Sequence, residues 1–164
     1  LKDYYAYYIG RFMNTFNYKF IDLSFNLSYS FGGYSYDNAS YILQDDGYSV
    51  ISNKSTEQRR RWQKPGDITD VPRFVYGNKK GGNYNSSRAI HSTDHIRLKS
   101  LILGLNAPKA WLQKLGIGNA RIYFSGTNLL TWAAYDQYDP EMSGVVGFYT
   151  PPLKTYAFGL ELKF

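Results

Sequence analysis

The amino-acid sequence predicts an all-β fold of one kind: about five strands, with long loops, of a transmembrane antiparallel β-barrel. Large apolar residues alternate strictly with small or polar ones in two long segments, 21–31 and 155–164, as in strands with one apolar and one polar face. No run of 18 apolar residues occurs, which excludes a membrane-spanning helix. Long and short connections alternate between the expected strands, as they do in outer-membrane barrels.

The last segment has the dimensions of a membrane strand. Residues 154–164 span about 36 Å, and a tilt of about 40° leaves a height of about 28 Å, close to the thickness of the hydrocarbon core of a bilayer. A half-buried strand of a soluble sandwich would alternate in the same way, but it has no reason to finish on an exposed aromatic residue. The pattern resembles the signal by which the outer-membrane assembly machinery recognises barrels, carried here by Tyr156, Phe158, Leu160, Leu162 and Phe164.

The composition fits a barrel better than a nucleic-acid-binding protein. Aromatic residues make up 18% of the chain although the mean hydropathy is −0.45, as in barrels whose strands face water on one side. The net charge of +6 includes only one dense basic run, 59–61. We therefore expect no binding of nucleic acid, and a run that is solvated or faces lipopolysaccharide phosphates. The chain has no cysteine and begins at Leu1 without a signal peptide, so we expect a piece of a longer envelope protein.

The first two expected strands lie at 4–17, where the early residues have loop character, and at 21–31, after a tight connection at 18–20. In 21–31, six apolar residues alternate with five polar ones without exception, whereas a helix would scatter the apolar residues around its circumference. The polar face carries Asp22, whose burial in lipid would be costly. This face is therefore expected to look into the barrel lumen.

A long loop is expected at 32–94. It holds turn-forming groups at 45–47, 64–67, Asn78 and Gly81–Gly82–Asn83. A loop of this length is usually functional or disordered, and its aromatic side chains favour a folded lid over disorder. These aromatic residues are Tyr34, Tyr36, Tyr41, Tyr48, Trp62, Phe74, Tyr76 and Tyr84.

The remaining elements are two strands, a helical turn and a second loop. The segment 95–106 is expected to be a strand with a β-bulge near Ser100, because its apolar residues change there from even to odd positions. Pro108 and Gly116 bracket a short helical turn in the order usual for helices. A further strand is expected at 119–132, and a loop at 133–152 leads to the last strand.

The lengths of the connections predict an orientation. If the last strand ends in the periplasm, the long loops 32–94 and 133–152 are extracellular, and the short connections 18–20 and 107–118 are periplasmic. Five strands cannot close a barrel, which needs about eight, and unpaired strand edges are costly in lipid. The sheet is therefore expected to be completed by other strands, most simply those of a missing N-terminal part.

Several stretches, in order along 17–164, resemble the SusC/RagA family of TonB-dependent outer-membrane transporters. One departure is Phe20, where a small residue such as glycine is commoner, and it bears only on the local turn. The matching stretches are RWQKPGDITDVPR (61–73), NSSR (85–88), DHIRLKSLILG (94–104), LGI (115–117), RIYFSGTNLLTW (121–132), YDPE (138–141) and PPLKTYAFGL (151–160).

This resemblance implies that the chain is the C-terminal part of a barrel of about 22 strands with a plug domain inside. It also implies active import of glycan fragments, or of peptides in some members, across the outer membrane of a Gram-negative cell. The implied partners are the remainder of the barrel and plug, a SusD-like surface lipoprotein acting as a lid, and the TonB complex acting through the missing plug. Outer-membrane lipid and lipopolysaccharide would surround the barrel.

Neither an enzyme nor a cofactor or metal site is predicted. His91, Asp94 and His95 lie at a loop-to-strand junction without a cysteine or further histidine in support, so a structural or solvated role is favoured. Asp139 and Glu141 could act as paired carboxylates or bind Ca²⁺, but a turn around the intervening proline is favoured. No nucleophile motif or phosphate-binding loop occurs.

Aromatic residues in the loops and at strand ends are the candidates for substrate binding, because such rings can stack on the CH faces of sugars. The alternative is that they pack the loops together or form the interfacial girdle of a barrel, for which Trp132 and Tyr123 are the expected members. The candidate substrate-binding residues are Trp62, Tyr135, Tyr138, Phe148 and Tyr149.

Two other functions compete with active import. A passive structural or adhesive barrel would belong to a parent chain without a plug and a TonB-contacting segment. A soluble carbohydrate-binding β-sandwich would be a monodisperse monomer in the absence of detergent.

Overall fold

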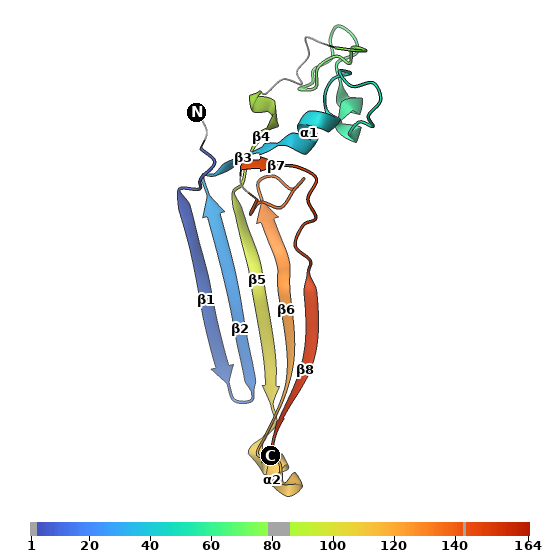
Figure 1. The fold of residues 1–164 in the computed structure, drawn as a ribbon. Helices are drawn as coiled ribbons and strands as arrows, with labels where there is room; N and C mark the ends of the chain where they lie inside the picture. The colour runs from blue at the N-terminus through green and yellow to red at the C-terminus, as the bar shows by residue number, and fades with distance from the viewer. Residues whose placement is uncertain (1–2, 79–85, 143) are drawn as a thin grey trace.

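The computed structural model describes residues 3–78, 86–142 and 144–164. Its main element is a long antiparallel sheet of five strands (Figure 1). The strand order is β1-β2-β5-β6-β8, so each long strand pairs with the next one along the chain. The bounds are β1 Tyr8–Tyr18, β2 Ile21–Phe31, β5 His95–Asn106, β6 Asn119–Ala133 and β8 Thr155–Lys163.

All five expected strands are present, with small differences at their ends. β2 and β5 have the predicted bounds, and β6 is one residue longer. Residues 4–7 precede β1, where the Tyr7 N–H donates to the Phe31 carbonyl (3.0 Å). β8 begins at Thr155 and ends one residue before Phe164. Period-2 alternation locates strand interiors well, but an end is set by the last ladder bond, which the pattern does not encode.

The pairing register gives the sheet one apolar and one polar face. Leu23, Leu103, Phe124 and Phe158 lie side by side across β2, β5, β6 and β8. The neighbouring row, on the opposite face, is Ser24, Ile102, Ser125 and Ala157. The alternation predicted from sequence therefore continues unbroken across four strands.

The apolar face is uncovered in the part of the chain that the structure describes. Figure 1 shows the sheet as a single layer, and Leu160 and Leu162 are exposed. Leu23 and Phe25, flanked by the rings of Phe12 and Phe16, are only partly shielded by neighbours on the same face. The buried apolar residues among those described all lie outside the five strands: Val71, Ala89, Leu112 and Val146. The sheet therefore has no interior of its own, as expected for a wall between lipid and water.

The predicted local features of the sheet are confirmed. The register between β2 and β5 shifts at Asn26 and Leu27, which pair with Ser100 and Leu98, so Lys99 is the extra residue of a β-bulge in β5. Residues 19–20 form the tight turn between β1 and β2, with Lys19 at φ 53°. Between β5 and β6 lies helix α2, Lys109–Leu115, which ends at Gly116 in the left-handed conformation (φ 68°). Neither α-helix in the described residues is long and apolar enough to cross a membrane.

A second, smaller sheet joins the two long loops and was not predicted. β3 pairs antiparallel with β4 and parallel with β7, so a strand from the second loop extends a hairpin-like pair from the first. Strands of three or four residues are too short to show a period. The turn expected at Gly81–Gly82–Asn83, with Tyr84 and Asn85, lies outside the described residues. The loop elements are β3 Tyr34–Asp37, α1 Asn38–Leu43, η1 Thr56–Arg60, η2 Ser87–Ala89, β4 Ile90–Ser92 and β7 Gly144–Val146.

The prediction that Tyr123 belongs to an interfacial girdle is wrong. Tyr123 pairs with Gly159 on the polar face, and the Arg121 guanidinium lies 5.2 Å from its ring centroid. The phenol ring occupies the space next to Gly159 that a Cβ atom would fill. Trp132, by contrast, lies beside Ile96 on the apolar face at the loop end of the sheet, where a girdle residue is expected.

Replacing Gly159 by valine is expected to destabilise the folded sheet by about 1–3 kcal/mol, because the new side chain collides with the Tyr123 ring. The measurement is the folded fraction of the parent protein during a urea titration in detergent. Ala157→Val, which adds bulk on the same face of β8, serves as the control. If the collision is the cause, Gly159→Val combined with Tyr123→Ala recovers most of the loss.

Candidate functional site

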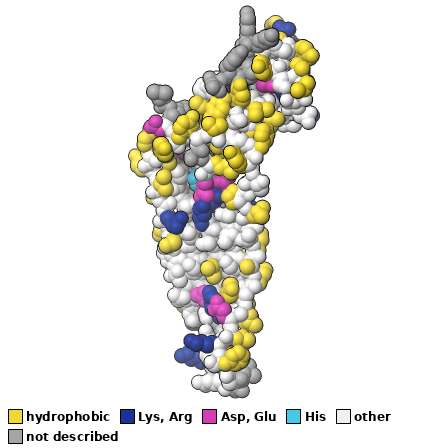
Figure 2. Space-filling view, in the orientation of Figure 1, with side chains coloured by type: hydrophobic (Ala, Val, Ile, Leu, Met, Phe, Trp, Pro, Cys, Tyr) yellow, Lys and Arg dark blue, Asp and Glu magenta, His cyan; other side chains and the backbone are white. Residues whose placement is uncertain are grey.

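Charged side chains gather at separate levels on the polar face (Figure 2). The cluster nearer α2 joins four strands. Arg121 of β6 donates to both oxygens of Asp22 of β2 (2.6 and 3.1 Å), and Asn106 of β5 donates to the same carboxylate (2.7 Å). Arg121 also lies 3.3 Å from Glu161 of β8. Every charge here has a partner within the wall, so the cluster holds adjacent strands together.

The second cluster lies near the loop end and ties the 133–152 loop to the wall. Arg97 of β5, only 3% exposed, donates to Asp139 (2.7 Å) and to Glu141 (3.0 Å). Lys99, at the bulge, contacts the Glu141 carboxylate (2.5 Å). The His95 ring faces Glu141 at 3.8 Å and contacts the Thr93 carbonyl through Nδ1 (2.8 Å). Two carboxylates of one turn are thus fixed to two cations of the sheet.

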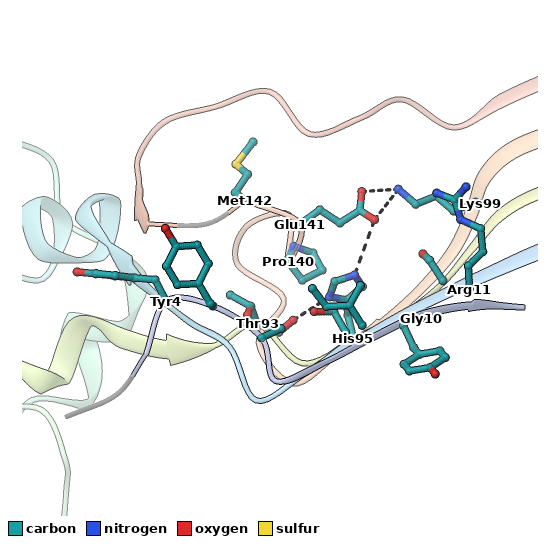
Figure 3. Close-up of a pocket in the computed structure, with 15 residues that line it drawn as sticks. Tyr4, Gly10, Arg11, Thr93, His95, Lys99, Pro140, Glu141 and Met142 are labelled. Carbon is teal, nitrogen blue, oxygen red and sulfur yellow. Dashed lines mark hydrogen bonds and ion pairs between the residues drawn. The ribbon is translucent and has the colours of Figure 1, made fainter.

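Two hollows flank this pinned turn, and Pro140, Glu141 or Met142 contribute to their walls. The first hollow, of about 510 Å³, lies between the turn and strands β1 and β2 (Figure 3). The second hollow, of about 610 Å³, lies on the side of β6 and the 147–154 segment. Representative lining residues are Tyr4, Tyr5, Ile9, Arg11 and Lys99 for the first hollow, and Arg97, Asn128, Tyr138, Phe148 and Tyr149 for the second.

Three of the five candidate substrate-binding residues line the second hollow. Phe148 and Tyr149 are 69% and 66% exposed there, so their rings are free to stack on a ligand. Tyr138 lines the same hollow, and its hydroxyl contacts Ser35 of β3. The structure therefore brings together aromatic residues that are eleven positions apart in the chain.

The other two candidates lie elsewhere. Tyr135 donates to Asp37 (2.9 Å) and stacks on the His91 ring at 3.8 Å between centroids, which joins the two loops. Burial raises the pKa of the Tyr135 and Tyr138 hydroxyls above the ordinary value for tyrosine. Trp62 is in the long loop, where its backbone N–H donates to the Val71 carbonyl (2.9 Å), and it lines neither hollow.

The acidic and histidine residues weighed from the sequence have structural partners. Asp94 accepts from the Gly32 N–H (2.6 Å), next to β2. Asp139 closes the expected turn, because its carbonyl accepts from the Met142 N–H (3.1 Å), but the ion pairs with Arg97 were not predicted. Among the residues described, no three His, Cys, Asp or Glu side chains are grouped as metal ligands.

Sequence reasoning missed the basic residues of the site, Arg11, Arg97 and Lys99. One signal was present: Arg11 and Arg97 occupy polar positions of their strands, so both side chains belong to the lumenal face. The partners of Arg97 and Lys99 were hidden because Asp139 and Glu141 are more than 40 positions further along the chain.

The predicted assembly signal lies at the edge of the sheet. Tyr156, Phe158, Leu160 and Leu162 point to the apolar face of β8, and Phe164 follows the strand with 88% of its surface exposed. Within the described residues β8 pairs on one side only, with β6. The role of these residues in assembly stays a prediction.

An antiparallel sheet one layer thick, apolar and uncovered on one face, carrying paired charges on the other, is a section of the wall of a transmembrane β-barrel. No family model matches the chain. It is 31% identical to TonB-dependent receptor P3 of Formosa agariphila over 93% of its length, and 33% identical to TonB-dependent receptor P26 of the same organism over 80%. Only 16% and 13% of these two receptors are covered.

Solved structures of an importer also resemble this chain. The RagAB peptide importer in its closed-closed state matches with a TM-score of 0.81 and 28% identity, over 95% of this chain and 17% of that one. A structure described as the RagAB peptide transporter matches with the same TM-score and 26% identity. The chain belongs to the SusC/RagA family of TonB-dependent receptors and forms part of the barrel.

Proposed function

We propose that the protein containing this chain is an active outer-membrane importer of glycan fragments or peptides. In this proposal a SusD-like lipoprotein covers the extracellular mouth, and TonB supplies the energy through a plug domain elsewhere in the protein. The described strands supply part of the barrel wall. Both long loops are extracellular, and the 18–20 and 107–118 connections are periplasmic. The relatives named as TonB-dependent receptors and the RagAB peptide importer support this assignment.

The observation that carries the proposal is the turn at 137–142, which is pinned to the polar face. A loop fixed to the lumenal face of the wall narrows the lumen. It leaves a hollow on each side of the turn, lined by exposed rings and charged groups. Such mixed apolar and polar hollows are typical of small-ligand sites.

The proposal is tested with the whole transporter in its native membrane. The complex is purified from outer membranes through a tag on the receptor, and its bound ligand and partner proteins are identified by mass spectrometry. Uptake of the identified ligand is then measured in cells with and without TonB. We expect a lipoprotein to co-purify and uptake to stop without TonB. Undiminished uptake in cells without TonB would establish the passive barrel instead.

Removing one exposed ring of the second hollow is expected to weaken substrate capture. Tyr149→Ala, or Phe148→Ala, removes a stacking surface, which corresponds to about a 3- to 10-fold loss of apparent affinity. Tyr76→Ala is the matched control, because Tyr76 is 80% exposed and lines neither hollow. Uptake is measured over a range of ligand concentrations. Equal effects of Tyr149→Ala and Tyr76→Ala on uptake would show that Phe148 and Tyr149 do not bind the substrate.

A further inference from the structure

Arg11 is the one charged side chain of the first hollow without a partner among the described residues. The hollow is also lined by Lys99 and Glu141, which pair with each other at 2.5 Å. No hydrogen bond or ion pair joins Arg11 to a described residue. A guanidinium carries five donors and stays charged at all physiological pH values. Arg11 therefore offers an unused anion-binding group at the edge of a cavity.

The register places Arg11 and Lys99 on the same wall. Arg11 of β1 is opposite Ser28 of β2, which in turn is opposite Arg97 of β5. The bulge places Lys99 just beyond Arg97, two strands from Arg11, at a separation of about 10 Å between backbones. Figure 3 shows Arg11, Lys99 and Glu141 on the same side of the sheet. Long side chains from both strands can reach one small anionic group between them.

The charge balance around the hollow leaves room for one negative charge. Two cations of the lining, Arg11 and Lys99, face one carboxylate, Glu141, while Arg97 and Asp139, outside this hollow, pair with each other. The charged side chains that line the first hollow therefore have a net charge of one positive unit. A singly charged carboxylate balances this excess, whereas a doubly charged phosphate would leave a net negative charge inside the wall.

Lys99 already binds one carboxylate of this chain, and Arg97 binds the same group. The Glu141 carboxylate lies 2.5 Å from Lys99 Nζ and 3.0 Å from Arg97 Nη1. Next to the charged groups, Tyr4, Ile9 and Met142 provide an apolar lining. The hollow thus combines an anion-binding corner with a surface for the uncharged part of the same ligand.

We propose that the first hollow is a subsite for a carboxylate-bearing ligand, held by Arg11 and Lys99 while its uncharged part packs on Tyr4, Ile9 and Met142. This inference rests on the proposed import function and narrows its substrate class to acidic ligands. The carboxylate can come from an acidic peptide or from the uronic acid of an oligosaccharide. Arg11 is the anchor because binding there does not require an existing ion pair to break.

The test compares acidic and neutral ligands on the full transporter purified in detergent. One pair is an end-blocked alanine hexapeptide with a single aspartate and its asparagine counterpart. The other pair is a short oligogalacturonate and the corresponding neutral galactose oligomer. Binding is measured by calorimetry. We expect the carboxylate member of one pair to bind about tenfold more tightly than its neutral counterpart, and the responding pair identifies the source of the carboxylate.

Arg11→Gln is expected to abolish this preference while leaving the affinity for the neutral member unchanged, which also shows that the variant is folded. Arg11→Lys keeps the charge and should keep part of the preference. Arg73→Gln is the matched control, because Arg73 is also exposed and has no ion pair among the described residues. Equal binding of acidic and neutral ligands, or equal losses in Arg11→Gln and Arg73→Gln, would overturn the subsite and leave import standing. If no ligand binds and uptake does not depend on TonB, both the subsite and the proposed import function would be overturned.

Discussion

Replacing Asp139 by alanine is expected to release the 137–142 turn from the barrel wall, at a cost of about 2–4 kcal/mol for the hydrogen bonds that are lost. Arg97 is almost fully buried and donates to Asp139 at 2.7 Å. The variant leaves this guanidinium with Glu141 as its remaining carboxylate partner. Asp139 also accepts from the Glu141 N–H (2.9 Å), so the internal support of the turn is lost in the same step. Both hollows depend on the position of this turn.

The measurement is hydrogen exchange of the full transporter, followed by mass spectrometry of peptides covering 133–142. Exchange in this segment should rise steeply in Asp139→Ala and rise less in Asp139→Asn, which can still accept the Glu141 N–H. Glu57→Ala is the matched control. It removes an ion pair with Arg60 whose side chains are 47% and 59% exposed, and such pairs contribute about 0–1 kcal/mol. Unchanged exchange in Asp139→Ala would mean that the ion pairs do not hold the turn.

The long strands could be predicted from the sequence because every strand in a membrane wall alternates between lipid-facing and lumen-facing residues with a period of two. The pattern in 21–31 has no exceptions, and the register shows its continuation in Leu103, Phe124 and Phe158. Even the bulge, expected near Ser100 and found at Lys99, was visible in the sequence, since it shifts the period by one residue. The alternation and the bulge could be predicted because each is set by residues adjacent in the sequence and by contact with lipid, which is the same for every strand.

The candidate site could be predicted only in part, because its contacts join distant segments. Phe148 and Tyr149 were identifiable as loop aromatics. The pairing of Arg97 with Asp139, however, depends on the second loop folding back over the sheet, and that fold rests on the β3–β7 pairing. Three-residue strands leave no periodic trace in the sequence. The wrong girdle prediction for Tyr123 has another cause: its alternation with Ile122 and Phe124 already indicates the polar face, which the register confirms, and its aromatic character was given more weight than this pattern.

Replacing Leu103 by arginine is expected to destabilise the barrel by about 2–4 kcal/mol, since a charge would then face the hydrocarbon core. Leu103 is in the middle of β5, between Leu23 and Phe124, and its side chain is 40% exposed in this chain. The adjacent variant, Ile102→Arg, places the same charge on the polar face beside Ser24 and Ser125. Its cost should be much smaller, because that side chain reaches the water of the lumen.

The two variants also separate the membrane wall from a soluble sandwich. In water, a partly exposed leucine on an uncovered sheet face can become arginine at little cost, whereas in lipid the same change is severe. The measurement is the urea midpoint of the parent protein folded into phosphatidylcholine vesicles, with the amount of each variant in the outer membrane as a second observable. A lower midpoint for Leu103→Arg than for Ile102→Arg assigns the Leu103 face to lipid. If Ile102→Arg were the more damaging change, the apolar row through Leu23, Leu103 and Phe124 would not be the membrane surface, and the two hollows would not lie in a lumen.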